Sequence, residues 1–304
     1  MLSIAICTYR RADQLQILLA QWAQLLPQAP EVTELLVVNN GVDPRTSEVL
    51  ASYNSIEKLR EVTETELGLA NARNRALAEF TADAIWFLDD DTTLFSPAAL
   101  HAYISALDAY PNADYFGGPI QVDWQDQPPH WLRDEKLPVL NGLFGHYDLG
   151  GQDRDYDDSV LGPYGANFVL RRRLVDHVGW FDTRLGVKGA EIGRGEETDL
   201  FQRAKRAGAR GKYVAEALVG HRFQHERLNL TYLWQYGLAK GREAATNPAQ
   251  NHARPKWWFR RFLNQWLRGV AQLLRGRRDR FYQCWINMGV ARGRHVAQTK
   301  QGSN

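Results

Sequence analysis

The stretch Ile85-Trp86-Phe87-Leu88-Asp89-Asp90-Asp91 is an apolar run that ends in three consecutive carboxylates. Four large apolar side chains in succession predict a strand buried on both faces, as in a parallel sheet between helices. Adjacent acids repel one another unless a cation lies among them, and a divalent metal that carries bound phosphates is the usual cation. Ligands also collect at the carboxyl ends of strands in open α/β sheets. The stretch therefore predicts a metal–diphosphate site, with a solvated acidic turn as the alternative.

The chain as a whole has the composition of an ordinary globular protein. Its 304 residues are 44% hydrophobic and 24% charged, which suits one large α/β domain or one domain with an appendage. The two cysteines, Cys7 and Cys284, lie far apart and indicate neither a disulfide framework nor a metal cluster, so a reducing compartment fits best. The N-terminus has no signal-peptide pattern, and no run of about 18 apolar residues could span a membrane. We therefore expect a cytoplasmic protein.

Apolar runs alternate with helical periodicities in the first third of the chain. Strands are predicted at residues 2–7, 35–38, 59–62 and 85–88, and helices at residues 13–26, 44–53 and 68–80. Strands and helices that alternate at this spacing predict a parallel sheet with right-handed crossovers. A further helix is predicted to begin at Ser96-Pro97, with the serine as its cap.

The rest of the chain is less regular at first and then helical. The predicted elements are a strand at 115–122, long loops at 123–163, a strand at 165–170, helices from 172 and at 196–208, an extended stretch at 211–221, and a helix at 228–245. Loops as long as 123–163 inside a compact domain are usually functional. Pro248 is the predicted boundary to a C-terminal tail.

Five motifs occur in an order that resembles family 2 glycosyltransferases. They lie at residues 3–11, 34–41, 68–74, 87–91 and 195–200, the last followed by Arg203 and Gly208. The resemblance covers residues 2–225 and implies the α/β GT-A fold, a Rossmann-like and mostly parallel central sheet between helices. It also implies a nucleotide-sugar donor and a divalent metal, Mn²⁺ or Mg²⁺. Residues 1–225 would form the catalytic domain, with residues 1–122 as the nucleotide-binding half and 123–225 as the acceptor half, and 226–304 a helical extension.

The resemblance assigns one set of residues to the donor nucleotide. They are Thr8, Tyr9, Arg11, Asn39, Asn40, Arg73, Asp89 and Asp90. A tyrosine ring can lie against a nucleobase, and a guanidinium makes charge-assisted bonds to phosphate. The family usually has an aspartate at the position of Asn39. An amide can still contact a base, but the asparagine weakens the inference that this base is uracil, which stays the default. Asn40 can alternatively serve only to build the turn.

A second set of residues is assigned to the metal. Side chains two apart on an extended segment point the same way, so Asp89 and Asp91 are expected to converge while Asp90 points elsewhere. The resemblance implies that Asp91 and Asp89 bind the cation, with His221 as a further ligand and His225 as the alternative histidine. The cation would neutralise charge on the departing nucleotide.

The acceptor side is expected at the start of the helix at 196–208. Transfer to a hydroxyl needs a base, and the family places it where this chain has Glu197. Glu196 and Asp199 complete the predicted catalytic group, and direct displacement with inversion is implied. Candidate acceptor contacts are Trp131, Gly165 and Asn167, each with a structural role as the alternative.

The C-terminal tail combines arginines with large apolar residues. On the helix predicted at 254–274 one face carries Trp258, Phe262, Trp266, Val270 and Leu273, and the opposite face carries Arg261, Arg268 and Arg275. More arginines and aromatic residues follow at 275–285. This pattern is typical of a helix in the plane of an anionic membrane. Packing on the catalytic domain or a homodimer partner is an alternative, as is nucleic-acid contact, although we expect no nucleic-acid partner.

Together these patterns predict an inverting, metal-dependent glycosyltransferase of the hexosyltransferase type. It would move a sugar from a nucleotide-diphosphate sugar, by default a UDP-sugar, to a saccharide or lipid-linked acceptor, and it could lie at the inner face of the membrane. One rival is a nucleotidyltransferase, which normally has a glycine-rich loop after its first strand; residues 8–11 contain no glycine. The other rival is a non-catalytic scaffold that binds sugar or membrane.

Overall fold

The structure, a computed structural model, describes residues 1–132, 138–157, 160, 162–189, 192–246 and 258–301. Its contacts divide the chain into two compact units. The first comprises Met1–Asp123, Gly145–Glu191 and Gly195–Arg222; the second comprises Trp124–Phe144, Ile192–Arg194 and Phe223–Asn304. The predicted boundary at Pro248 lies outside the described residues.

The first unit is built on an eight-stranded sheet with the strand order β3-β2-β1-β4-β9-β6-β10-β8. Its strands are β1 (Leu2–Thr8), β2 (Val32–Asn40), β3 (Leu59–Glu64), β4 (Ala84–Asp89), β6 (Tyr115–Gly117), β8 (Arg154–Asp155), β9 (Asn167–Arg171) and β10 (Gly211–Tyr213). The strands β1 to β4 pair in parallel, as the sequence predicts. In contrast, β9 runs antiparallel to both neighbours, β4 and β6.

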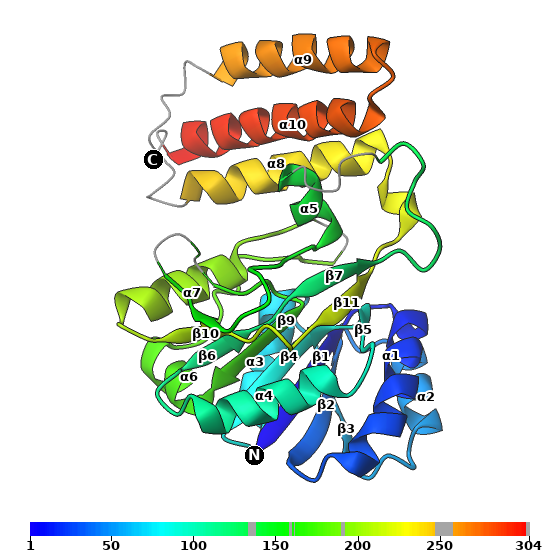
Figure 1. Ribbon diagram of the computed structural model, residues 1–304, viewed down its shortest axis with the longest axis vertical. Helices are drawn as coiled ribbons and strands as arrows, with labels where there is room; N and C mark the ends of the chain where they lie inside the picture. The colour runs from blue at the N-terminus through cyan, green and yellow to red at the C-terminus, as the bar shows by residue number, and fades with distance from the viewer. Residues whose placement is uncertain (133–137, 158–159, 161, 190–191, 247–257, 302–304) are drawn as a thin grey trace. The chain divides into compact units, whose positions relative to one another are not determined.

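Helices cover both faces of this sheet (Figure 1). The helices on one face are α1 (Ala12–Leu25), α2 (Pro44–Ser52) and α4 (Ala98–Ala109), and those on the other are α3 (Leu69–Glu79), α6 (Arg172–Val178) and α7 (Glu196–Arg206). Side chains of β1 alternate between the two cores, with Ile4 and Ile6 in the first and Ala5 and Cys7 in the second. Burial on both faces explains why these strands are continuous apolar runs.

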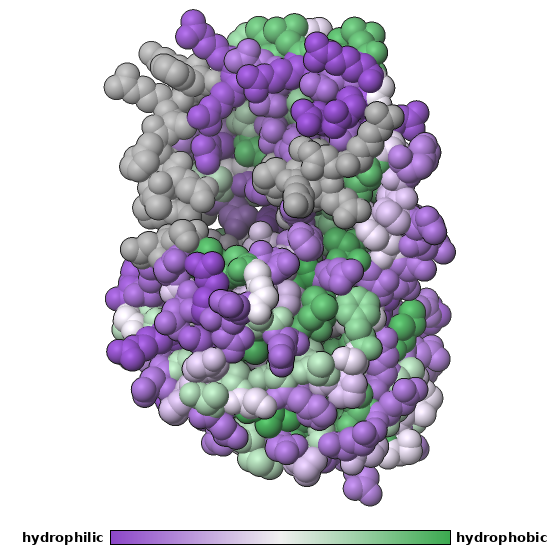
Figure 2. All heavy atoms as spheres, in the orientation of Figure 1, coloured by the Kyte–Doolittle hydropathy of each residue, from purple (hydrophilic) through white to green (hydrophobic). Residues whose placement is uncertain are grey.

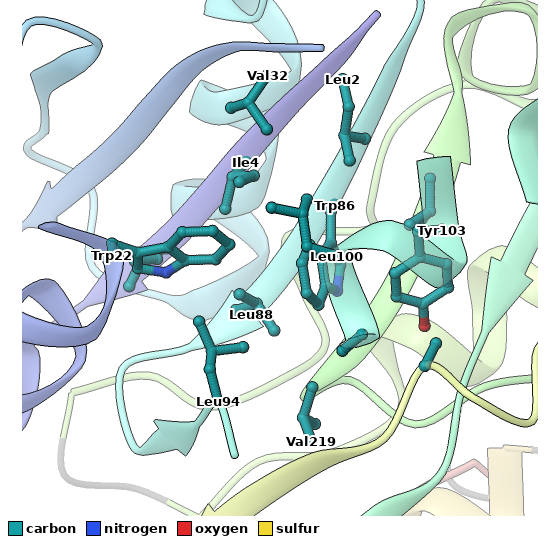
Figure 3. Packing of buried hydrophobic residues seen from close by; sticks show 14 of the residues in the cluster. Leu2, Ile4, Trp22, Val32, Trp86, Leu88, Leu94, Leu100, Tyr103 and Val219 are labelled. Atoms are coloured by element: carbon teal, nitrogen blue, oxygen red, sulfur yellow. The ribbon is translucent and has the colours of Figure 1, made fainter. Parts of the chain in front are cut away.

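Trp86 lies in the first core, where Figure 3 shows it among side chains from the sheet and from α1 and α4. Its ring packs edge-to-face against Tyr103 at 5.0 Å, and its indole N–H donates to Asn167 Oδ1 at 3.0 Å. The Tyr103 hydroxyl donates to the same oxygen at 2.9 Å. The Asn167 amide N–H groups donate to the carbonyl oxygens of Pro119 and Ala217. One buried asparagine therefore ties β9 to four other parts of the unit.

Two segments predicted as single extended stretches are each divided between two sheets. Residues 115–122 form β6 in the main sheet and the start of β7 (Ile120–Asp123) in a three-stranded sheet of order β5-β11-β7. The break follows Gly118, where an added Cβ would lie 2.3 Å from the carbonyl oxygen of Ala217, and Pro119 has no N–H for a ladder. Residues 211–221 likewise divide into β10 and β11 (Val219–Arg222), and β5 is Thr92–Thr93.

The register of the parallel strands aligns the polar ends of β1, β2 and β4. Cys7 pairs with Asp89 across β1 and β4, and Thr8 pairs with Asn39 across β1 and β2. The predicted donor residues of these three strands therefore lie at one edge of the sheet, where ligands of open α/β sheets bind.

The second unit is helical among its described residues. It contains α5 (Pro138–Phe144), the 3₁₀ turn η2 (His225–Arg227), α8 (Leu230–Thr246), α9 (Trp258–Leu274) and α10 (Arg278–Gln301). Helix α10 packs between α8 and α9 (Figure 1). A Cβ added at Gly241 would lie 2.2 Å from the Val290 carbonyl oxygen, and one at Gly293 would lie 2.2 Å from that of Leu238. Glycine thus lets α8 and α10 meet backbone to backbone.

The aromatic residues at 281–285 pack within this unit instead of forming a free apolar face. Trp285 is half-buried, and its indole N–H donates to the carbonyl oxygen of Leu230 at 2.8 Å. Tyr282 packs edge-to-face against Trp131 at 4.9 Å. These aromatic residues of α10 therefore contribute to the packing of the second unit itself.

The role of Asn167 can be tested by stability. Asn167→Ala is expected to lower the free energy of unfolding by about 2–4 kcal/mol, because it leaves the buried donors of Trp86 and Tyr103 without an acceptor. Denaturant titration followed by circular dichroism measures the change. Asn112→Ala, at an exposed position, is the control and should change stability by less than about 0.5 kcal/mol. Equal stability of the two variants would contradict the structural role.

Candidate active site

The acidic end of β4 has a different geometry from the one predicted. The strand ends at Asp89, and Asp90 and Asp91 lie in the turn that leads to β5. Side-chain alternation applies only to extended backbone, so Asp90 does not point away from Asp91. The two acids share one guanidinium: Arg11 Nη1 lies 2.7 Å from Asp90 Oδ1, and Nη2 lies 2.7 Å from Asp91 Oδ2.

Asp90 is a buried acid held by a hydroxyl and a cation. Its Oδ2 accepts a hydrogen bond from the Thr8 hydroxyl at 2.8 Å, so Thr8 positions this acid. Burial, with like charge from Asp91 and Asp89, raises the pKa of Asp90 to about 7, although the charge of Arg11 opposes the rise. The Arg11 guanidinium is thus a resident cation within the acidic cluster, which demonstrates that the cluster accommodates positive charge.

Asp91 also faces a histidine. β11 pairs with β5 in a register that aligns His221 with Thr92, and His221 Nε2 lies 3.6 Å from Asp91 Oδ2. The alternative histidine, His225, belongs to the second unit and packs beside Trp124. Within the described ranges, no three His, Cys, Asp or Glu side chains are arranged to hold a metal by themselves. Asp91 and His221 nevertheless suit a divalent cation that takes its other ligands from phosphate and water.

A buried arginine next to His221 fixes the acidic turn. The Arg222 guanidinium donates to the carbonyl oxygens of Asp90 and Thr92 at 2.8 and 2.6 Å, and its backbone N–H donates to that of Asp91 at 2.8 Å. The sequence motifs do not include Arg222. The only signal for it is an arginine at the end of a short apolar stretch beside a candidate ligand.

Buried Arg73 on α3 connects the end of β4 with the start of α7. Its Nη1 lies 2.8 Å from Glu197 Oε1 and 3.2 Å from Glu196 Oε1, and its Nη2 lies 3.6 Å from Asp89 Oδ1. Nη2 also donates to the carbonyl oxygen of Gly165 at 3.1 Å. The structure thus gathers predicted donor, acceptor and catalytic residues around one guanidinium, whose partners here are acids and a carbonyl.

The two adjacent glutamates of α7 differ in ionisation. Burial, together with the charge of Glu197, raises the pKa of Glu196 to about 8, so this carboxyl is protonated at neutral pH. Burial would also raise the pKa of Glu197, but the charge of Arg73 and hydrogen bonds to the carboxylate outweigh it and lower that pKa. Neighbouring groups whose pKa values are pushed apart have separate acid–base roles. This difference supports Glu197, and not Glu196, as the proton acceptor.

Asp199 orients a neighbour on its own helix. Its Oδ2 accepts a hydrogen bond from Arg203 Nε at 2.8 Å, and Arg203 Nη2 donates to the carbonyl oxygen of Trp180 at 2.8 Å. Asp199 therefore secures the loop before α7 through Arg203.

The amides of Asn39 and Asn40 build the turn after β2. Asn39 is fully buried, and its Nδ2 donates to the Asp43 carbonyl oxygen and to Glu61 Oε1, both at 2.9 Å. Asn40 bonds to the backbone of the loop at residues 64–68. These partners hold both amides in the turn, and a base contact by Asn39 stays a prediction.

Tyr9 lies against the turn that follows β2, and its contact with a nucleobase stays a prediction. It is half-buried beside the turn, where a Cβ on Gly41 would lie 3.0 Å from its ring, and Gly41 has a φ of +79°. A side chain at position 41 would therefore collide with the tyrosine and strain the backbone.

The predicted acceptor residues are not all gathered at the site. Gly165 is part of it, since an added Cβ there would lie 1.8 Å from Glu197 Oε1. Asn167 is fully buried with both amide groups bonded to the protein, so it offers an acceptor no polar atom. Trp131 belongs to the second unit, where it contacts Tyr282.

The fold and this arrangement of acids define a glycosyltransferase of the GT-A type. The chain belongs to glycosyl transferase family 2, whose sequence profile matches residues 3–179.

Two curated relatives match most of the chain. It is 24% identical over 237 residues to the glucosyl-dolichyl phosphate glucuronosyltransferase of Haloferax volcanii, covering 76% of this chain and 72% of the relative. It is 25% identical over 245 residues to the succinoglycan biosynthesis protein ExoM of Rhizobium meliloti, covering 76% of this chain and 70% of the relative.

Two solved structures have a similar fold. The mannosyltransferase PcManGT from Pyrobaculum calidifontis, solved with GDP-Man and Mn²⁺, has a TM-score of 0.54 at 16% identity, covering 99% of this chain and 79% of that chain. The mannosyl-3-phosphoglycerate synthase from Rubrobacter xylanophilus has a TM-score of 0.52 at 18% identity, covering 84% of this chain and 76% of that chain.

The ionisation of Glu196 gives a pH test. A carboxyl whose pKa is raised on folding stabilises the native state most below its unfolded pKa, near 4.5, and this contribution is lost as the pH rises to about 8. The unfolding free energy of wild type minus that of Glu196→Gln is therefore expected to fall over this range, by at most about 1.4 kcal/mol per pH unit.

Denaturant titrations between pH 5 and 8 measure this difference, with the exposed Glu57→Gln as the control. A difference for Glu196→Gln that stays constant with pH, as for the control, would contradict a protonated Glu196.

Proposed function

We propose that the protein transfers a sugar from a nucleotide-diphosphate sugar to a hydroxyl acceptor, with inversion and with a divalent metal. The observation that carries this proposal is the sharing of Arg73 between Asp89 and Glu197, at 3.6 and 2.8 Å. An acid at the donor end of the sheet and a candidate base thus contact the same guanidinium. The donor and acceptor sides are therefore close together, and direct displacement requires this proximity.

Each residue would act through groups already arranged in the unit. Glu197 takes the proton of the acceptor hydroxyl as the oxygen attacks the anomeric carbon, the bond from that carbon to the diphosphate oxygen breaks, and the nucleoside diphosphate leaves. Arg73 keeps the Glu197 carboxylate ionised and in place. Tyr9 lies against the base of the donor. Asp91 and His221 would hold Mn²⁺ or Mg²⁺, which when bound neutralises negative charge on the diphosphate.

Arg11 would serve the donor side in a second way. Its guanidinium bridges Asp90 and Asp91 in this structure. Asp91 would hold the metal, and Arg11 would then be available to the phosphates of the nucleotide. This supports the assignment of Arg11 to the donor.

The relatives guide the choice of substrates. We propose a UDP-sugar as the first donor to test; the GDP-Man in the Pyrobaculum structure makes guanosine diphosphate sugars the next. The dolichyl phosphate in one relative's name and the polysaccharide in the other's support a lipid-linked or saccharide acceptor in glycolipid or polysaccharide synthesis. We further propose peripheral attachment to the inner face of the membrane, with a homodimer as the alternative use of the C-terminal helices.

Glu197→Gln is expected to lower glycosyl transfer by about a hundred- to ten-thousand-fold, because the amide cannot accept the proton. A nucleotide-release assay with Mn²⁺ over UDP-, GDP- and dTDP-sugars, with saccharide and lipid-phosphate acceptors, measures it. Donor binding should be kept, since Glu197 is not assigned to the nucleotide. Glu226→Gln, outside the first unit, is the matched control and should retain activity.

No turnover of any donor by the wild type would refute the transferase proposal. Unchanged turnover in Glu197→Gln would place the base elsewhere or favour a binding scaffold.

Asp91→Asn and His221→Ala are each expected to abolish the metal-dependent part of nucleotide binding. For wild type, UDP with Mn²⁺ should raise the melting temperature by several degrees above UDP alone, because a ligand that binds only the native state stabilises it. Differential scanning fluorimetry reports this without any turnover. His225→Ala is the discriminating control and should keep the rise. Loss of the rise in His225→Ala but not in His221→Ala would reverse the choice of histidine.

A further inference from the structure

Helix α9 packs on the rest of the second unit through only one of its faces. The ring of Trp258 stacks on His295 of α10 at 4.7 Å, and Phe262 meets Trp234 of α8 at 6.3 Å. One and two turns further along, Gln265 and Gly269 continue this half-buried face. These contacts fix the rotation of α9 about its axis, and this rotation determines which of its faces are exposed to solvent.

A second face of α9 is apolar and exposed. Its side chains recur at intervals of three and four residues, which places them in one continuous row along the helix. This apolar stripe consists of Phe259, Leu263, Trp266, Leu267, Val270 and Leu273, all of them exposed. Figure 2 shows hydrophobic (green) spheres over α9 at the surface. Contiguous exposed apolar surface of this kind marks an interaction site.

The predicted apolar face is thus shifted around the helix. Trp258 and Phe262 were expected on the same face as Trp266 and Val270, but they pack inward. The exposed row instead includes Leu263 and Leu267, each of which follows a residue of the predicted face by one position in the sequence.

A third face borders the apolar stripe and is basic. Arg260, Arg261, Arg268 and Arg275 are exposed there, and Figure 2 shows hydrophilic (purple) spheres beside the green ones. No aspartate or glutamate occurs from residue 258 to residue 278. The first acid that follows, Asp279, is fully buried and pairs with Arg277 at 3.0 Å. The row of arginines therefore has no acid on its own helix.

We infer that α9 lies in the plane of an anionic membrane, with the apolar stripe in the acyl boundary and the arginines on lipid phosphates. This inference deepens the membrane attachment in the proposed function by naming the helix, the face and the lipid charge. It does not depend on the chemistry at Glu197. No helix among the described residues is long and apolar enough to cross a bilayer. An apolar stripe beside a basic row is the arrangement that binds a surface of anionic lipid.

Charge favours the membrane over a second copy of the chain. Two α9 stripes packed on one another would bring their arginine rows together, with no acid on either helix to pair with them. Like charges within a Debye length repel. Anionic lipids supply the opposite charge along the whole helix, so the same feature that weakens a dimer strengthens binding to the bilayer.

The test is co-sedimentation of the full chain with vesicles of phosphatidylcholine and phosphatidylglycerol in equal parts, and with vesicles of phosphatidylcholine alone. Wild type is expected to sediment with the anionic vesicles, and less so at high salt. Leu263→Glu should weaken this binding at least about tenfold, because it places a carboxylate among apolar side chains at the acyl boundary. Ile17→Glu on α1 is the matched control, since Leu263 and Ile17 are both 43% exposed.

Replacing Arg260, Arg268 and Arg275 by glutamine should remove the preference for anionic over neutral vesicles. Circular dichroism establishes that each variant is folded, and donor turnover in solution should match wild type in all of them. Failure of wild type to sediment, or equal sedimentation of Leu263→Glu and Ile17→Glu, overturns the inference. A wild-type dimer that Leu263→Glu converts to a monomer, without any vesicle binding, also overturns it. If the chain binds vesicles but turns over no donor, the transferase proposal is refuted and the membrane inference is upheld.

Discussion

The burial of one guanidinium, that of Arg73, is the constraint on which the site depends. A charge removed from water destabilises the fold unless ion pairs and hydrogen bonds replace its hydration. Here two glutamates of α7, Asp89 of β4 and the Gly165 carbonyl replace it, and the rings of Phe168 and Phe181 lie 5.4 and 5.6 Å away. Because these groups come from distant parts of the chain, the site exists only when the main sheet and the helical layer that contains α3 and α7 have formed.

A second guanidinium balances charge at the end of β4. Arg11 lies between Asp90 and Asp91, while Arg222 holds the backbone of the same turn. Three adjacent carboxylates can therefore be kept close together without ligands. The two arginines have different partners. Arg11 pairs with carboxylates, for which another cation can compete, whereas Arg222 donates to backbone carbonyl oxygens, for which it cannot.

Much of the first unit could be predicted from sequence, because strands buried on both faces leave continuous apolar runs. The direction of β9 could not be predicted, because an apolar run does not indicate whether a strand is parallel or antiparallel to its neighbours. Nor could the break after Gly118, which depends on a contact with Ala217 about a hundred residues away. At the site, the acids are prominent in the sequence because they occur in a fixed pattern, and their chemical roles stay predictions. The partners of Asn39 and Asn167 could not be predicted, because an amide bonds equally well to a ligand or to its own fold, and only tertiary contacts decide between them.

The glycine contacts between α8 and α10 have an entropic consequence for the second unit. In the folded pair, Gly241 and Gly293 allow the backbones to touch without freezing any side-chain rotamers. In the unfolded chain, glycine is the most flexible residue and weakens each isolated helix. Each helix is therefore expected to be unstable on its own. Helicity in this part of the chain should be gained cooperatively, when the two backbones come into contact.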